Sequence, residues 1–428
     1  MQATRRVSWW GIPASLLLLA LACAPSAGAP TGAAPANPAS APAAPQAGTS
    51  GSAAAAPAPA GAAAQPAAVA EAEAQSAAGA ARLKADAAAW QRYQDGARRE
   101  GKVVVSGPGF PGLRQGITEG FQKAYGITVE YLGLGAGEVI PRVDRESQAG
   151  NVTIDVNIGG TSSCWAMADR GQIDDATPLL VDPSLFNAAS WRGGHMKPIL
   201  PSPNEPKDFL CGLQGEEWVM TDLFVNPQLV PPDSIKSWKD LLKPEYKGKI
   251  ISFDPRRAGS AQTTVAYLYT LFGEDYVRDL YVGQNVQVTA DYRQLAEAVA
   301  RGSYPIGIAL VQANVEPLRA EGLPIQRVFP ADGPGALTGG FGTVHKIKNG
   351  PDPNAAAVFM NWFASKDAQD MWEREMMETS LRTDVAHQVP DYVIPKAGVS
   401  YTIDDYNPDY FFAKRAPAIA KITEMLGR

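Results

Sequence analysis

Short apolar runs alternate with segments of helical spacing from about residue 81 onward. The runs at residues 102–106, 127–132 and 154–158 are typical of buried strands. Apolar positions between residues 81 and 99 recur at the spacing of one helix face, and residues 138–148 form another helical segment. Because strands that alternate with helices form parallel sheets through right-handed crossovers, this pattern predicts an α/β lobe.

A second series of the same kind follows an extended stretch at residues 217–225. The predicted strands cover residues 249–253, 286–288 and 305–310, and the predicted helices cover residues 260–272, 274–282, 292–301 and, after a glycine-rich turn, 355–377. We therefore expect an α/β protein of two lobes joined by at least two crossing segments.

The expected first lobe is discontinuous and combines residues 83–224 with residues 331–428, whereas residues 225–330 form the second lobe. The ends of strands and the amino termini of helices from both sheets converge between two such lobes. The cleft between the lobes is therefore the expected binding site.

The first 82 residues have a different composition. Residues 1–22 have a basic start, an apolar run and small residues before Cys23, which is the layout of an export signal. The residues around Cys23 resemble a lipoprotein lipobox and predict a lipid on that cysteine; an incidental thiol in an ordinary signal is the alternative. Residues 23–82 are mostly Ala, Pro, Gly and Ser, which predicts a disordered linker.

Charge and composition narrow the class of partner. The chain has 428 residues, 35 Pro, 3 Cys and a formal net charge of -6. The length and the low cysteine count exclude a disulfide-rich mini-protein. The chain is mildly acidic and lacks the clustered basic residues with which proteins displace counterions from nucleic acid. We therefore expect a small-molecule or protein partner and no nucleic acid.

Cysteine and histidine give little support for catalysis or metal binding. In an oxidising compartment Cys164 and Cys211 either pair or remain small buried residues, and both alternatives stay open. His195, His345 and His387 are widely spaced, without a zinc motif or a hydrolase nucleophile motif. We therefore expect no catalytic residue, no metal and no cofactor.

One ordered set of motifs resembles a known family. Residues 237–250, with Asp254-Pro255 and Ala258-Gly259-Ser260 after them, are similar to the second-lobe signature of extracellular solute-binding proteins of ABC importers. The branch includes ferric-iron, thiamine and phosphonate binders, and the resemblance extends over roughly residues 99–382. It implies a two-lobed periplasmic-binding-protein (clamshell) fold whose hinge closes on a ligand for delivery to a membrane permease.

The resemblance also bears on iron. Ferric binders of this branch ligate iron with adjacent tyrosines just after the strand that corresponds here to residues 305–310. Residues 311–314 contain no tyrosine. This departure disfavours direct ferric binding.

Anion-binding chemistry is indicated at the turn after the third strand. Gly160, Thr161 and Ser162 are predicted to open a helix there. Exposed N–H groups and the helix dipole favour an anion at such a position. Ordinary capping of the helix by a hydroxyl group is the alternative.

A second turn places Arg256 and Arg257 close to Ser260. A guanidinium group matches the two oxygens of a carboxylate or phosphate, so one arginine and Ser260 are expected to face the cleft. The other arginine is expected to be a solvated rim residue.

Further candidates follow other predicted strands or open the next helix: Ser106, Phe110, Asp291, Tyr292 and Gln312. The two aromatic rings either stack on an organic ligand or pack the lobe edges.

Together these features predict a monomeric, lipid-anchored solute-binding protein of an ABC importer. It would lie at the outer face of the bacterial cytoplasmic membrane or in the periplasm and capture a small anionic or zwitterionic organic solute. The alternatives are a ferric-iron or iron-chelate binder of the same fold, and an extracytoplasmic enzyme on a two-lobed α/β scaffold.

Overall fold

The computed structural model describes residues 65–220, 223–333, 335–396, 399, 401–403 and 407–427. The predicted signal at residues 1–22, Cys23 and the predicted linker up to residue 64 lie outside the described residues.

The first sheet has the strand order β2-β1-β3-β13-β5-β4. Its strands are β1 (Lys102–Gly107), β2 (Thr128–Gly133), β3 (Val156–Gly159), β4 (Lys197–Ile199), β5 (Gly212–Gln214) and β13 (Thr343–Lys346). β1 pairs in parallel with β2 and with β3, which confirms the predicted parallel core. β13, β5 and β4 extend the sheet through antiparallel pairs.

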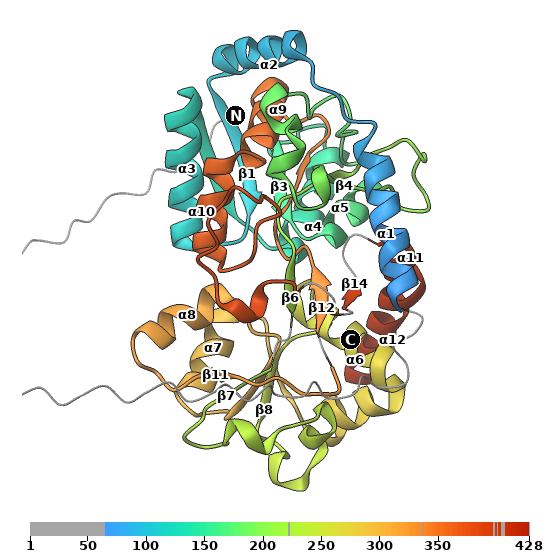
Figure 1. The fold of residues 1–428 in the computed structure, drawn as a ribbon, viewed down its shortest axis with the longest axis vertical. Coiled ribbons are helices and arrows are strands. Elements are labelled where there is room, and N and C mark those ends of the chain that lie inside the picture. Colours follow the sequence, from blue (N-terminus) through green and yellow to red (C-terminus); the bar gives the residue numbers. More distant parts are fainter. Residues whose placement is uncertain are drawn as a thin grey trace, which may run out of the picture. The chain divides into compact units, whose positions relative to one another are not determined.

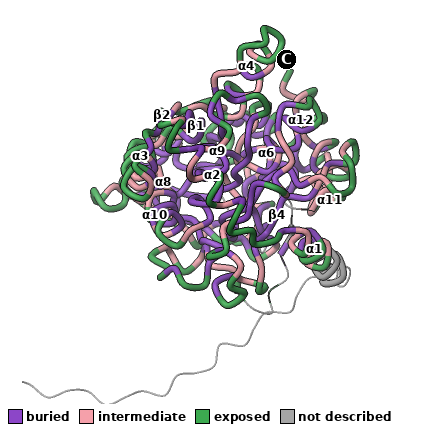
Figure 2. The backbone as a smooth tube through the Cα atoms, turned by 90° about the horizontal axis from the view of Figure 1, so that it is seen from above, coloured by how far each residue is buried: buried purple, intermediate pink, exposed green. Residues whose placement is uncertain are grey.

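Helices bury both faces of this sheet. They are α2 (Ala87–Glu100), α3 (Pro111–Tyr125), α4 (Ala136–Gln148), α5 (Thr161–Ala168), α9 (Pro353–Phe363) and α10 (Lys366–Met376). Successive side chains of a strand point to opposite faces. Accordingly, Val103 and Val105 pack in a core with α3 and α9, whereas Val104 packs in another with α4 and α5. In Figure 2 the buried segments lie in the interior and the exposed ones at the rim.

The second sheet has the strand order β11-β7-β10-β8-β9. Its strands are β7 (Leu223–Val225), β8 (Ile250–Phe253), β9 (Gln287–Thr289), β10 (Ile306–Ile308) and β11 (Gln326–Arg327). β10, β8 and β9 are parallel, as expected, and β7 runs antiparallel to β10. The accompanying helices are α6 (Ser260–Arg278), α7 (Tyr292–Ala300), α8 (Gln312–Ala320), α11 (Pro408–Tyr410) and α12 (Ala416–Leu426).

A small third sheet lies between the two larger ones (Figure 1). It has the strand order β14-β12-β6, with β6 (Trp218–Met220), β12 (Ala336–Thr338) and β14 (Thr402–Ile403). β6 leads from β5 toward β7, and β12 returns from β11 toward β13. These antiparallel neighbours are two segments at which the chain crosses between the lobes.

The folded part begins before the expected boundary at residue 82. Helix α1 (Gln65–Ala80) packs against β4, and Ala72 lies in a buried cluster with Val219 of β6 and Leu337 of β12. An Ala-rich segment alone cannot stabilise a fold, but here the body of the protein supplies its apolar contacts. Only the part of the predicted linker before residue 65 lies outside the structure described.

Two predicted helices also have different bounds. The helix expected from about residue 81 begins only at Ala87, because the Asp86 side chain accepts a hydrogen bond from Ala89 N at 2.9 Å and caps it. The long helix expected over residues 355–377 is two helices, α9 and α10, and Ser365 caps the second.

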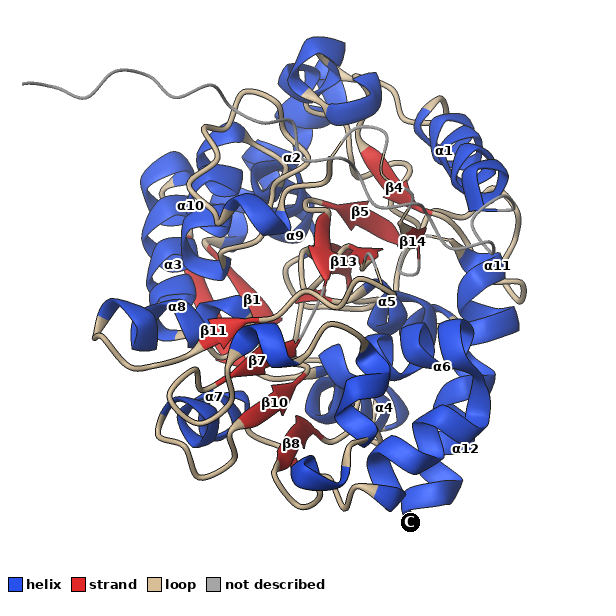
Figure 3. Cartoon of the chain, turned by 60° about the horizontal axis from the view of Figure 1, so that its bottom comes forward, coloured by secondary structure: helices blue, strands red, loops and turns tan. Residues whose placement is uncertain are grey.

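The carboxyl-terminal helix lies with the second lobe rather than the first. α12 packs against α6, as Figure 3 shows, and Ile422 belongs to the core of the second sheet. The assignment of all of residues 331–428 to the first lobe therefore does not describe α12. Among the described residues, no helix has both the length and the apolar character needed to cross a membrane.

Candidate functional site

A cleft of about 580 Å³ opens between the two larger sheets. Its walls are the loops that follow β1, β2 and β3 in the first lobe and β8, β9 and β10 in the second. Trp218 and Met220 of β6 and Thr338 of β12 contribute from the crossing strands. Both lobes and the connection between them therefore border the same volume.

The first-lobe wall includes the amino terminus of α5. Gly160 is the cap residue, and no side chain caps the helix. Because the first N–H groups of a helix have no partner within it, this end offers backbone donors to the cleft. Gly160 and Ser162 line the cleft, but Thr161 is fully buried and its hydroxyl lies 3.1 Å from that of Thr343. Thr161 therefore faces the sheet and not the cleft.

The second-lobe wall includes the amino terminus of α6. Ser260 N donates to Tyr292 Oη at 3.0 Å, and Ser260 Oγ donates to the Ala309 carbonyl at 2.7 Å. The Tyr292 ring stacks on Phe253 with 3.9 Å between the ring centroids. It also meets the edge of Phe341 from the first lobe, at 6.2 Å between centroids. Tyr292 is thus an aromatic contact across the cleft.

The two adjacent arginines have different surroundings. Arg256 Nε and Nη2 donate to Asp254 Oδ1 at 2.9 Å and Oδ2 at 2.8 Å, so its guanidinium is already occupied. Burial alone would raise the pKa of Asp254, but these hydrogen bonds outweigh burial and hold that pKa below its usual value. Arg256 is not part of the cleft wall.

Arg257 lines the cleft and reaches toward the opposite lobe. A Cβ atom on Gly137, in the first turn of α4, would lie 4.0 Å from Arg257 Nη2. Within the described part of the chain, Arg257 makes no ion pair. Its charge is therefore available to a ligand carboxylate or phosphate.

The remaining predicted residues divide into two groups. Phe110 and Asp291 line the cleft, although Asp291 Oδ1 already caps α7 by accepting from Arg293 N at 2.8 Å and Gln294 N at 3.0 Å. Ser106 and Gln312 are fully buried. The Ser106 hydroxyl donates to Asn157 Oδ1 at 2.8 Å, and Gln312 Oε1 accepts from Tyr392 Oη at 3.1 Å.

The structure thus brings seven predicted residues to one cleft: Phe110, Gly160, Ser162, Arg257, Ser260, Asp291 and Tyr292. It places four elsewhere: Ser106, Thr161, Arg256 and Gln312. The four have polar partners inside their own lobe, and a strand-end position alone does not reveal such partners.

The cleft also contains polar residues that the sequence pattern did not indicate, namely Trp218, Asn314, Glu378 and Arg415. Behind them lies Glu216, whose Oε1 accepts from Gly342 N at 2.7 Å and whose Oε2 accepts from Trp372 Nε1 at 2.6 Å. Burial raises the pKa of Glu216 to about 7 despite these bonds and one from Glu378. Only the glycine-rich turn at residues 339–342 marked this region in the sequence.

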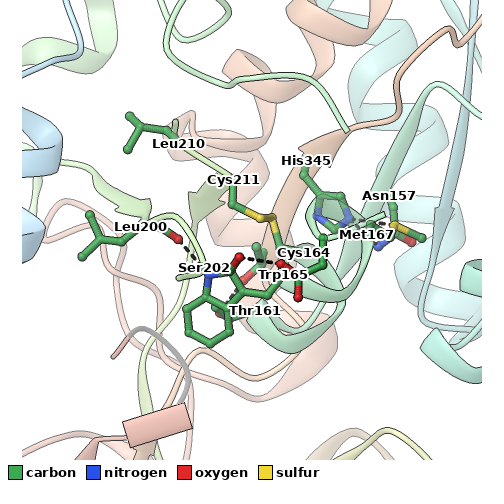
Figure 4. Close-up of a disulfide and its surroundings, with 12 residues drawn as sticks. Asn157, Thr161, Cys164, Trp165, Met167, Leu200, Ser202, Leu210, Cys211 and His345 are labelled. Atoms are coloured by element: carbon green, nitrogen blue, oxygen red, sulfur yellow. Dashed lines mark hydrogen bonds between the residues drawn. A yellow bond between two sulfur atoms is a disulfide. The ribbon is translucent and has the colours of Figure 1, made fainter. Parts of the chain in front are cut away.

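A disulfide anchors α5 behind the cleft. Cys164 of α5 and Cys211, just before β5, are bonded, with their Cα atoms 5.9 Å apart. Figure 4 shows Asn157, Met167 and His345 beside it. Burial lowers the pKa of His345 to about 3, so this histidine is neutral near pH 7. Neither cysteine is free for catalysis.

Metal-binding chemistry is sparse in the described residues. None of their His, Cys, Asp and Glu side chains form a group of three that suits a metal ion. His387 pairs with Glu373 at 2.9 Å, and none of the three histidines lines the cleft.

Two α/β lobes that share a polar cleft, joined by a pair of crossing strands, form the architecture of a solute-binding protein. Residues 116–393 match the family model described as "Bacterial extracellular solute-binding protein", and the chain belongs to this family.

Three proteins are similar to this chain in sequence or in structure. An uncharacterised protein of Haemophilus influenzae is 26% identical over 311 residues, which cover 69% of this chain and 82% of that protein. The periplasmic binding protein AfuA of Actinobacillus pleuropneumoniae, solved with fructose-6-phosphate, is 20% identical with a TM-score of 0.58, covering 76% of this chain and 98% of that one. Iron-bound HitA of Pseudomonas aeruginosa is 16% identical with a TM-score of 0.57, covering 76% and 99%.

These matches confirm the clamshell fold and the class of function. The protein is an extracellular solute-binding protein, so it acts outside the cytoplasm and has a small-molecule ligand. Members of this family bind solutes rather than convert them, so the protein is not an enzyme and the enzyme alternative is wrong.

Proposed function

We propose that the cleft captures a small organic anion, with a carboxylate or phosphate held between the two lobes. The observation that carries this proposal is the position of Arg257. It extends from the second lobe toward the first, has no ion-pair partner among the described residues, and borders the cavity that the uncapped end of α5 also borders. Fixed N–H donors on one wall and a guanidinium on the other suit an anion.

The rest of the cleft favours an organic ligand over a bare inorganic ion. A volume of about 580 Å³ is within the range of small-molecule sites. Phe110 lies on one wall and Tyr292 on the other, where they offer apolar contact to carbon atoms. A ligand that touches both walls stabilises the closed form through its differential affinity for it.

Fructose-6-phosphate, which AfuA holds, belongs to the proposed class and is a suitable first probe. The test is a thermal-shift screen of the full chain with matched pairs: fructose 6-phosphate with fructose, and ferric citrate with citrate. An anion at 100 times its Kd adds roughly 2.7 kcal/mol to the free energy of unfolding.

We expect at least one organic anion to raise Tm while its neutral counterpart does not. Stabilisation by ferric citrate without any by iron-free anions would overturn the proposal in favour of the ferric alternative. Stabilisation by neutral sugars alone would overturn it in favour of an uncharged ligand.

We also propose that Cys23 carries a lipid that tethers the protein to the outer face of the membrane. The Ala- and Pro-rich segment after Cys23 would give the folded part reach from that surface. In fractionated bacteria the wild-type protein should sediment with membranes, and Cys23→Ser should be released or fail to mature. Membrane association of Cys23→Ser equal to wild type would contradict the tether.

A further inference from the structure

We propose that Trp218, Glu378 and Asn314 form a second polar subsite in the cleft that binds a hydroxyl group, so that the solute is a polyhydroxylated organic anion. This inference rests on the proposed function and adds what the cleft recognises beyond the anionic group. Trp218 belongs to β6, Asn314 to α8, and Glu378 follows α10, so the subsite combines a crossing strand with both lobes.

Gly340 shows how closely two of these groups converge. A Cβ atom on Gly340 would lie 2.6 Å from Trp218 Nε1 and 2.9 Å from Glu378 Oε2. Gly340 has a φ of +50° and lines the cleft, and the absence of a side chain lets the neighbouring polar groups approach its backbone closely. An indole donor and a carboxyl oxygen therefore face the same small volume beside the cavity.

The Trp218 indole is the group that most requires a ligand. Its side chain is only 4% exposed, and Nε1 has no hydrogen-bond partner in the structure described. Buried polar groups are nearly always hydrogen-bonded, and an indole N–H can only donate. The missing partner must therefore be an acceptor.

Asn314, in the second lobe, has a buried acceptor without a hydrogen-bond donor among the described residues. This acceptor is Oδ1, and the residue lines the cleft. This oxygen can only accept. Closure on a ligand would thus have to supply a donor here and an acceptor at Trp218.

Glu378 offers a further acceptor. It is hydrogen-bonded to Glu216, both side chains are fully buried, and a hydrogen bond between two carboxyl groups requires a proton on one of them. The pair therefore carries a single negative charge. A ligand donor can bind there without separating two buried charges.

Among simple ligand groups, hydroxyls meet all of these demands. A hydroxyl accepts from Trp218 and donates to Glu378 or Asn314. An ammonium group cannot accept from the indole, and a carboxylate cannot donate to the amide oxygen. Neighbouring hydroxyls, as in a sugar phosphate or sugar acid, satisfy the subsite while the anionic group meets Arg257.

Calorimetric titration of the full-length wild type with fructose 6-phosphate and with hexyl phosphate tests the inference. Trp218→Phe keeps an aromatic ring of smaller size and removes the N–H donor. Trp238→Phe is the matched control, because Trp238 Nε1 is also buried without a hydrogen-bond partner among the described residues but does not line the cleft. Asn314→Ala gives a second variant in case Trp218→Phe fails to fold.

We expect wild type to prefer the hydroxylated phosphate at least tenfold, and Trp218→Phe to reduce that preference by about five- to tenfold, as expected for loss of one buried hydrogen bond. Trp238→Phe should leave the preference unchanged, and Asn314→Ala should reduce it. Equal wild-type affinities, or equal losses for both ligands in Trp218→Phe, would overturn the hydroxyl subsite. If neither phosphate nor any other anion bound, the proposed function itself would fail.

Discussion

The helices α5 and α6 both begin with a glycine at the cleft, but the two glycines are there for different reasons. Gly259, before α6, has a φ of +153°, and a Cβ there would collide with the Tyr292 hydroxyl. Gly160, before α5, has an ordinary φ of -76°. A Cβ on Gly160 would approach only the Gly340 carbonyl, at 3.2 Å, and the Ser162 hydroxyl, at 3.5 Å.

Backbone geometry therefore demands glycine at position 259 but not at position 160. An Asp or Ser at position 160 would cap α5 and stabilise it, yet the chain leaves this end open. At α6, by contrast, Tyr292 Oη already accepts from Ser260 N. The first lobe thus offers free backbone donors held in place, and the second lobe offers side chains that arrive when the lobes close.

The largest expected effect is a pH-dependent change in stability caused by His345, which is buried in the first lobe beside the disulfide of α5. Below pH 6.5 the unfolded chain protonates a histidine, whereas the pKa of folded His345 is about 3. The free energy of unfolding therefore falls as pH drops from 6.5 toward 3, by up to about 1.4 kcal/mol per pH unit. His345→Gln should abolish this contribution, which urea unfolding at a series of pH values would measure.

Comparing the pH dependence of stability in wild type and His345→Gln separates the contribution of His345 from that of two buried carboxyl groups with the opposite pH dependence. Burial raises the pKa of Asp155 to about 6 and that of Glu216 to about 7, so each adds stability as pH falls. Both remain in the variant. A variant whose pH profile runs parallel to that of wild type between pH 6.5 and 4 would contradict the assignment of a neutral, buried His345.

The next effect is loss of the disulfide. Cys164 and Cys211 are 47 residues apart, and closing a loop of that length in the unfolded chain contributes about 2–4 kcal/mol. The double variant Cys164→Ser/Cys211→Ser should lose that much unfolding free energy in urea titrations. Added reductant should destabilise wild type and leave the double variant unchanged; equal sensitivity to reductant would contradict the pairing.

A third effect tests the open end of α5. Gly160→Asp adds a cap and a negative charge, so the protein should gain about 0.5–2 kcal/mol of stability and lose at least tenfold in anion affinity. Gly160→Ala is the control, since it adds the same Cβ without charge or hydrogen-bond acceptor. If both variants bound the anion alike, steric change and not the helix terminus would be responsible.

The smallest effect tests α6. Tyr292→Phe keeps the stack on Phe253 but removes the acceptor for Ser260 N. We expect a stability loss of about 1 kcal/mol and a change in anion affinity of only two- to threefold. A larger loss of affinity than in Gly160→Asp would reverse the roles assigned to the two helix ends.

The sequence predicted those strands and helices whose structure is determined by the local pattern of apolar and polar residues. The strands β1, β2, β3, β8 and β10 lie in apolar runs long enough to identify, and their order implied the cleft. The strands of the third sheet have two or three residues each, and only their pairing partners make them strands. Their existence, and the closeness of Trp218 to Glu378, depend on contacts between segments far apart in the sequence.

The same limit applies to individual site residues. Arg256 and Arg257 are equivalent in the sequence, and the ion pair with Asp254 that separates their roles depends on which way the turn directs each side chain. Thr161 and Ser162 differ likewise by their positions on one helical turn. The sequence therefore identified the turns that border the cleft, but the direction of each side chain determines which of their residues line it.

The two arginines also provide the most direct test of an anion held between the lobes. Calorimetric titration with the best anion from the screen should show that Arg257→Ala loses at least tenfold in affinity, as expected for a charge-assisted contact, while Arg256→Ala stays within threefold of wild type. The neutral counterpart of the anion should distinguish none of the proteins. Equal affinities of Arg257→Ala and Arg256→Ala for the anion would contradict the proposed site.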